Sequence, residues 1–212
     1  MADEPMNDTQ STSALQSVCV YCGSGPGKNP AYVEAARVFG GILAKSRIGL
    51  VYGGGSLGLM GETARAALNH GGHVTGIIPG FLSEREHMLI QAQELIVVDD
   101  MHQRKQLMFV KSDAFVALPG GLGTLEEFVE QLTWSQLGRH AKPIVLANID
   151  GFWEPLMALI AHMRAAQFIR PNLEVDLLKA ERVEDILPRL RGAAARIPES
   201  AKAMAPEVAR RM

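Results

Sequence analysis

Short apolar runs rich in β-branched residues recur along the chain, and stretches with helical periodicity separate them. Six runs are apolar throughout rather than alternating, which is typical of strands buried on both faces of a parallel sheet. Repeated strand–helix–strand units predict an α/β fold with a doubly wound, mainly parallel sheet and helices on both faces. The predicted strands cover residues 17–21, 48–52, 73–78, 94–98, 113–118 and 143–148.

Local signals mark the ends of two helices. Asn29 followed by Pro30 combines a capping side chain with a proline at the first helical position, which predicts a helix through about Lys45. The pair Gly71-Gly72 ends a second helix that starts near Leu57. Ligands of such sheets bind at the carboxyl ends of the strands, so residues that directly follow strands are the candidates for function.

The length of 212 residues and the hydrophobic content of 47% suit one domain with a proper core. Residues 1–15 are polar and lack the pattern of a signal peptide, so we expect a disordered tail there. Residues 192–212 are rich in Ala, Pro and Arg and are expected to form a loosely attached tail. A single nucleotide-binding catalytic domain is predicted over 16–191, and no apolar run reaches the length of about 18 residues that a membrane span needs.

Charge and cysteine content limit the classes of binding partner and the kinds of site that the chain is expected to have. With 21 basic and 23 acidic residues the chain has no electrostatic footprint for nucleic acid or a membrane surface, which leaves a small molecule or another copy of itself. The only cysteines, Cys19 and Cys22, have the C-x-x-C spacing of redox and zinc sites. Cys19 lies inside an apolar run and no second ligand pair exists, so we favour a structural role, no metal and a cytoplasmic protein.

A first glycine loop, GGGSLGLMG (53–61), follows the second predicted strand. It satisfies G-x-G-x-x-G, but the next strand ends without the acid of a dinucleotide site, and no Lys-Ser or Lys-Thr makes it a P-loop. Backbone amides at a helix N-terminus remain, and these can bind one phosphate. The alternative is a tight turn that needs glycine for its backbone. The candidate phosphate-binding residues are Gly54, Gly55 and Gly58.

A second loop, PGGLGTLEE (119–127), follows the fifth predicted strand. Gly120, Gly121 and Gly123 let backbone amides approach a ligand, and the next helix adds the positive end of its dipole. Two such loops from different strands can face one crevice, and CGSGPG (22–27) is a candidate third wall.

Two hypotheses account for the acid at the end of the second loop. Thr124 and Glu127 fit a capping box, in which each caps the other's backbone amide. The helix would then bury Leu125, Phe128, Val129 and Leu132, with Glu127 pointing away from them. Alternatively, Glu127 serves a sugar carbon that gains positive charge while a glycosidic bond breaks, either by stabilising the cation or by activating water.

Arg104 and the segment 80–88 complete the candidate crevice. Arg104 lies in a helix that follows the fourth predicted strand, and a guanidinium there suits phosphate, ribose oxygens or a departing base. His102, nearby, is more often a surface residue than a proton carrier. Arg85 and Glu86 belong to a stretch too polar for the core, which could be a flap over the site.

The motifs GGGSLGLMG, DMHQRK and PGGLGTLEE, followed by KPIVLANIDGFW, together resemble the Lonely Guy family of cytokinin riboside 5'-monophosphate phosphoribohydrolases, over about residues 18–190. The resemblance implies a Rossmann-like fold, at least a homodimer, and hydrolysis of adenosine 5'-monophosphate or its N6-modified forms without metal or organic cofactor. It implies that Arg104 and Glu127 are catalytic. The substrate contacts that it implies are Arg85, Glu86, Lys105, Pro119, Gly120, Gly121, Gly123 and Thr124.

Two other functions were weighed. Family members have carried the label "possible lysine decarboxylase", but a pyridoxal enzyme needs a Schiff-base lysine, and nothing marks Lys105, Lys111 or Lys142 as one. A non-catalytic nucleotide or cofactor carrier could keep the glycine loops, yet it has no reason to need both Arg104 and Glu127. Release of adenine from AMP would separate an AMP nucleosidase from a carrier.

Overall fold

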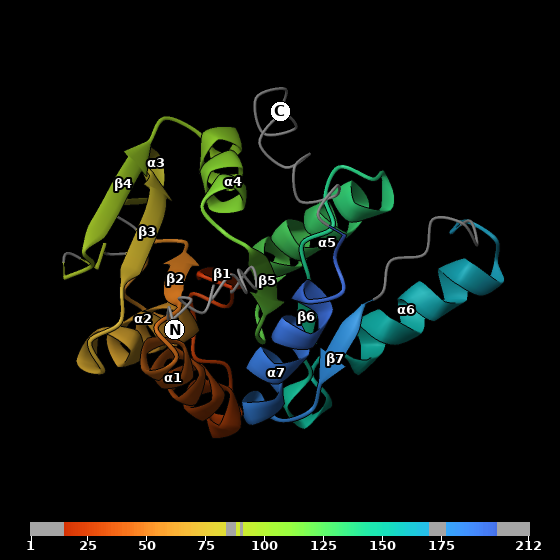
Figure 1. The fold of residues 1–212 in the computed structure, drawn as a ribbon, viewed down its shortest axis with the longest axis horizontal. Helices are drawn as coiled ribbons and strands as arrows, with labels where there is room; N and C mark the ends of the chain where they lie inside the picture. Colours follow the sequence, from red (N-terminus) through yellow and green to blue (C-terminus); the bar gives the residue numbers. More distant parts are fainter. Residues whose placement is uncertain (1–14, 84–87, 90, 170–176, 199–212) are drawn as a thin grey trace, which may run out of the picture.

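A computed structural model describes residues 15–83, 88, 89, 91–169 and 177–198. Its centre is a seven-stranded parallel sheet with the order β4-β3-β2-β1-β5-β6-β7 (Figure 1). The strands are β1 (Ser17–Tyr21), β2 (Gly49–Tyr52), β3 (Val74–Pro79), β4 (Glu94–Val98), β5 (Ala114–Ala117), β6 (Ile144–Ala147) and β7 (Leu178–Ala180). The helices are α1 (Pro30–Lys45), α2 (Gly58–Asn69), α3 (Gly80–Ser83), α4 (Met101–Val110), α5 (Leu122–Gln136), α6 (Glu154–Ala165), α7 (Val183–Ala194) and the 3-10 turn η1 (Ile149–Gly151).

The doubly wound parallel sheet predicted from the sequence is confirmed. All six predicted strands form, and their ends differ from the prediction by at most one residue. The predicted cap of α1 is present too, because the Asn29 side chain accepts a hydrogen bond from the amide of Ala31 at 3.0 Å. β7 was not predicted, since it is a three-residue edge strand with a lysine at its centre and lacks an apolar run.

The strand order reverses at β1. The chain first builds β2, β3 and β4 outward from β1, and then returns through α4 to place β5 on the other side of β1. The connections after β1 and β5 therefore leave in opposite directions and open a crevice at the carboxyl ends of these two strands. Tyr21 and Ala117 are register partners there, so the segments that follow them lie side by side.

Alternating residues of β1 face two apolar layers. Val18 and Val20 pack with the layer of α1, α2 and α7, whereas Cys19 and Tyr21 face the layer of α4, α5 and the start of α6. Cys22 belongs to the first layer, so the two buried cysteines, which form no disulfide, lie in different parts of the core. Burial raises the pKa of the Cys19 thiol far above its usual range. This placement supports the structural interpretation of the C-x-x-C spacing.

The ends of the described chain show two further features. α7 continues to Ala194, which is buried, so the segment predicted as a loose tail from residue 192 begins inside this helix. No helix in the described ranges is both long and apolar enough to cross a membrane.

Candidate active site

The second glycine loop forms the N-terminus of α5. The helix begins at Leu122, its N-cap is Gly121, and the amide of Leu125 already donates to the Gly121 carbonyl at 3.0 Å. Thr124 is therefore the third residue of the helix rather than its cap, and Glu127 is the sixth. The capping-box hypothesis is wrong, because the helix starts three residues earlier than that motif requires.

The buried face of α5 is also different from the predicted apolar stripe. Glu127 is only 7% exposed, whereas Val129 is 41% exposed. Of the four predicted stripe residues only Phe128 is fully buried, because Leu125, Val129 and Leu132 line an open apolar groove between α5 and α6. The buried residues of α5 are Thr124, Glu127, Phe128 and Gln131.

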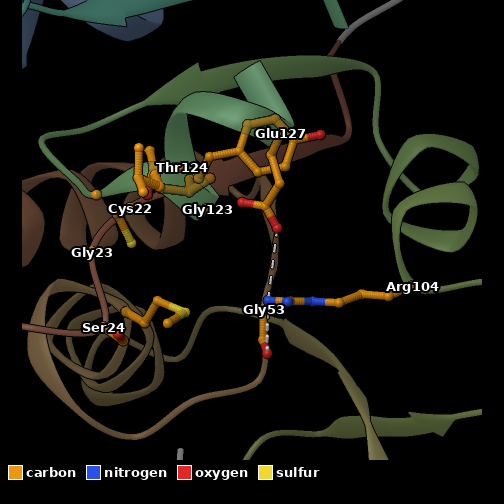
Figure 2. Close-up of a pocket in the computed structure, with 13 residues that line it drawn as sticks. Cys22, Gly23, Ser24, Gly53, Arg104, Gly123, Thr124 and Glu127 are labelled. Atoms are coloured by element: carbon orange, nitrogen blue, oxygen red, sulfur yellow. Dashed lines mark hydrogen bonds and ion pairs between the residues drawn. The ribbon is translucent and has the colours of Figure 1, made fainter. Parts of the chain in front are cut away.

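A cavity of about 240 Å³ lies at the carboxyl ends of β1, β2 and β5 (Figure 2). It brings together Arg104 from α4, Glu127 from α5, and the first turn of α5, as the sequence predicted. The loop after β1 forms another wall, which confirms that expectation. The lining residues are Val20, Tyr21, Cys22, Gly23, Ser24, Gly53, Met60, Arg104, Gly121, Leu122, Gly123, Thr124 and Glu127.

Arg104 extends from α4 into the space between Gly53 and Glu127 (Figure 2). Its Nη2 atom lies 3.8 Å from Oε1 of Glu127 and 3.4 Å from the carbonyl oxygen of Gly53. The side chains of Arg104 and Glu127 are 7% and 10% exposed. A direct guanidinium–carboxylate hydrogen bond is typically about 2.7–2.9 Å long, so this pair is held together loosely.

The guanidinium also has an unused donor. Nε of Arg104 is buried and has no hydrogen-bond partner among the residues that the structure describes. A buried donor without an acceptor costs about 1–3 kcal/mol, and a ligand oxygen or ring nitrogen in the cavity would relieve that cost. The arrangement is therefore suited to a ligand that brings hydrogen-bond acceptors.

The glycines of the second loop differ in what surrounds them. A Cβ atom at Gly120 would overlap Oγ1 of Thr124, so the packing of the protein requires glycine there. A Cβ atom at Gly121 or Gly123 would meet no atom within 4 Å, and both residues line the cavity. The carbonyl of Pro119 accepts a hydrogen bond from the Gly23 amide and joins this loop to the end of β1.

The first turn of α5 has backbone groups of the kind that bind anions at helix N-termini. Gly121 provides no side-chain cap, and the first amides of any helix have no partner within the helix. These amides and the positive end of the helix dipole point toward the cavity side of α5.

The first glycine loop is placed differently. Gly53 lines the cavity, while Gly54, Gly55 and Gly58 are absent from its described lining. The carbonyl of Gly54 accepts from the amide of Leu89, and Gly55 pairs with Met88. A Cβ atom at Gly58 would overlap the backbone of Ser24. Arg85 and Glu86, just before Met88, lie outside the described residues.

Lys105 joins α4 to α5 outside the cavity. Its ammonium group lies 2.5 Å from Oε1 of Glu126 and 2.9 Å from Oε1 of Glu130. Burial lowers the pKa of Lys105, but the hydrogen bonds that its ammonium group donates to these two carboxylates outweigh burial and raise the pKa overall. Lys105 is not among the described residues that line the cavity, although the resemblance placed it among the substrate contacts.

Tyr21 and Met60 line the cavity without having been singled out from the sequence, whereas Ser24 and Gly53 belong to loops that were expected there. The pKa of Tyr21 is raised well above its usual value, first by burial and then by the neighbouring Cys19 and Glu127, so its hydroxyl stays protonated. Tyr21 could have been found as the last residue of β1. Met60 could not, because only the tertiary packing of α2 against β1 brings it to the cavity.

Comparison with known proteins agrees with this geometry. The family model described as "Possible lysine decarboxylase" matches residues 60–190. A protein of Oryza sativa subsp. japonica, named as a probable cytokinin riboside 5'-monophosphate phosphoribohydrolase, is 50% identical over 167 residues, which cover 79% of this chain and 74% of the relative. A cytokinin riboside 5'-monophosphate phosphoribohydrolase of Rhodococcoides fascians is 44% identical over 183 residues, 86% of this chain and 92% of the relative.

Among solved structures, the molybdenum cofactor carrier protein of Chlamydomonas reinhardtii has a TM-score of 0.64 and 22% identity, with 86% of this chain and 100% of that chain covered. At this identity the likeness concerns the fold alone. Fold and site together define an enzyme, a Rossmann-like α/β protein with a buried arginine–glutamate pair at its switch point. The chain belongs to the Lonely Guy family, whose family model bears the decarboxylase description.

Proposed function

We propose that this enzyme hydrolyses the N-glycosidic bond of adenosine 5'-monophosphate or its N6-modified, cytokinin-type forms, and releases the free base and ribose 5-phosphate. The observation that carries the proposal is the buried Arg104–Glu127 pair beside the open amides at the start of α5. The names of the relatives, which are phosphoribohydrolases of cytokinin riboside 5'-monophosphates, support the same substrate class.

The proposed chemistry assigns separate charges of the substrate to separate parts of the site. The amides of Gly121, Gly123 and Thr124 hold the 5'-phosphate at the positive end of α5. Glu127, one turn further along the helix, lies close to the ribose and stabilises the oxocarbenium-like state or activates the attacking water. Arg104 orients the nucleotide and donates to the departing base.

The other substrate contacts predicted from the sequence are part of this proposal. Gly54 and Gly55 were expected to add amides to the phosphate site, and Arg85 and Glu86 to contact the substrate from the segment before Met88. The closeness of Gly55 to Met88 supports a role for that segment at the first loop.

Pyridoxal chemistry fits the described residues poorly. Lys105 and Lys111 are engaged with carboxylates, and Lys142 donates to the Phe109 carbonyl at 2.6 Å. The described lining of the cavity includes no lysine that could form a Schiff base. The decarboxylase description therefore has no support in this site.

The alternative function, a non-catalytic carrier, would bind a nucleotide without consuming it.

The decisive experiment compares Glu127→Gln with Glu126→Gln. The Glu127 variant keeps the shape of the site but loses the charge, so we expect kcat for release of adenine from AMP to fall about 1000-fold while AMP binding persists. Glu126 is an exposed neighbour on the same helix that pairs with Lys105, and a glutamine there can still accept the hydrogen bond of Lys105, so its variant should keep wild-type turnover. Unchanged turnover in Glu127→Gln would sink the assignment. A wild-type protein that is thermally protected by AMP but releases no base would be a carrier.

We also propose that the enzyme is a homodimer, in keeping with the resemblance. α6 buries none of its own residues, and with α5 it lines an apolar groove of about 400 Å³ that includes Leu125, Val129, Leu159 and Met163. Exposed apolar surface of this kind is typical of interfaces. Sedimentation of the wild-type chain would test the proposal. A cytoplasmic location is likewise a proposal, supported by two buried cysteines that form no disulfide.

A further inference from the structure

Gly53, the first residue after β2, raises a question that phosphate binding does not answer. Its backbone is not among the positive-φ glycines, which are Gly27, Gly54, Gly58, Gly71, Gly138 and Gly151. The φ angle at this position therefore does not itself require glycine. Some other feature of the structure must account for a glycine here.

The surroundings of Gly53 supply that feature. A Cβ atom at this position would overlap Nη2 of Arg104 and would lie 3.3 Å from Cζ of the same side chain. The third close atom is Sδ of Met60, at 3.1 Å, which belongs to a flexible side chain. The guanidinium thus occupies the volume that any side chain at residue 53 would fill.

We propose that Gly53 is a positioning residue, whose bare Cα forms a shelf that fixes the guanidinium of Arg104 opposite Glu127. The Gly53 carbonyl accepts from Nη2 at 3.4 Å on one side, and Glu127 lies 3.8 Å from the same nitrogen on the other (Figure 2). The carboxylate and the shelf together define where the guanidinium can rest.

The shelf explains why the first glycine run begins directly at the end of β2. A longer residue at 53 would push the guanidinium away from Glu127, and a displacement of about 1 Å at a reacting centre can cost about 100-fold in rate. The atoms that must move are the tip of a long side chain, so the fold should survive the change. A loss of function without a loss of fold is the signature of the shelf.

The test is a double-mutant cycle of Gly53→Ala and Arg104→Met, measured by thermal unfolding. Methionine keeps the stem of the side chain and lacks the atoms that the new Cβ would meet. Gly53→Ala should lower the melting temperature by about 4 °C in the wild type, and by about 1 °C or less in the Arg104→Met background. Equal losses in both backgrounds, including failure of both proteins to fold, would show a clash with the backbone and overturn the proposal.

Activity provides the second readout and rests on the proposed function. With AMP as the substrate, Gly53→Ala should lower kcat/KM about 100-fold. Gly49→Ala is the matched control at the other end of β2, because a Cβ there meets only ordinary contacts at 3.6 Å or more. Wild-type kcat/KM in Gly53→Ala would refute the shelf. If the wild type releases no base, the proposed function fails, while the unfolding cycle still decides on the shelf.

Discussion

The two glycine loops at the carboxyl edge of the sheet look alike in sequence and differ in what their glycines serve. In the first loop, a side chain at Gly53 would overlap Arg104 and one at Gly58 would overlap the backbone of Ser24. In the second loop, side chains at Gly121 and Gly123 would extend into open space. The first loop is glycine-rich because of the protein's own packing. The second shares that requirement only at Gly120, whose Cβ would overlap Thr124, whereas Gly121 and Gly123 stand at positions where only a ligand would need the room.

The largest effect is expected from Gly58→Ala in the first loop. Gly58 has a φ of 56°, and an added Cβ would overlap the Ser24 backbone, which cannot move like a side-chain tip. Left-handed backbone costs about 1–2 kcal/mol and overpacking about 1–3 kcal/mol, so the free energy of unfolding should fall by about 3 kcal/mol. Thermal unfolding measures this change.

The control for that change is Gly71→Ala. Gly71 also has a positive φ, of 72°, but a Cβ there would meet nothing within 4 Å, so its variant isolates the cost of the backbone conformation. We expect the Gly71 variant to lose about 1 kcal/mol. If Gly58→Ala kept wild-type stability and lost only affinity for AMP, the first loop would be a ligand cradle like the second.

A smaller effect, on substrate binding and not on stability, is expected from Gly123→Ala in the second loop. The new methyl group would meet no protein atom within 4 Å and would be added to the lining of the cavity where the phosphate is proposed to bind. KM for AMP should rise about 30-fold, which corresponds to roughly 2 kcal/mol, while the melting temperature stays near that of the wild type. Gly192→Ala in α7 is the control, because its Cβ also meets open space but far from the cavity lining. If the Gly123→Ala variant were stable and fully active, the glycines of the second loop would not be needed to leave room for a ligand, and the proposed difference between the two loops would be wrong.

The smallest effect is expected from Lys105→Met, which loosens the link between the two loops. Arg104 rests on the first loop, Glu127 belongs to the helix of the second, and Lys105 ties their helices together through Glu126 and Glu130. The ion pairs of Lys105 set the relative position of Arg104 and Glu127, which matters more for the transition state than for binding of the substrate. We therefore expect kcat to fall about 10-fold, roughly 1.4 kcal/mol, with KM little changed.

Lys111→Met is the matched control for the Lys105 variant. Lys111 caps the same helix and pairs with Glu94 at 3.0 Å, away from the cavity. Its loss should leave kcat unchanged. A rise in KM with unchanged kcat in Lys105→Met would instead favour the direct substrate contact that the family resemblance implied.

Local signals in the sequence were sufficient for most of the fold. The continuous apolar runs predicted every strand except β7, and Asn29-Pro30 predicted the start of α1, because the apolar pattern of a buried strand and the residues of a helix cap are both visible in a short stretch of sequence. The position of candidate chemistry after the strands was likewise predictable, because parallel strands end at one edge. Arg104 and Glu127 were selected on that basis and through resemblance, and they do line one cavity.

Only the tertiary structure showed what the individual residues at the carboxyl edge of the sheet do. The pattern around Thr124 suggested a cap and an exposed acid, but α5 starts three residues earlier and Glu127 is buried where it lines the cavity. The roles of the glycines were equally hidden. Whether a Cβ meets Arg104, the Ser24 backbone or open space depends on residues distant in sequence, and no local pattern contains those distances.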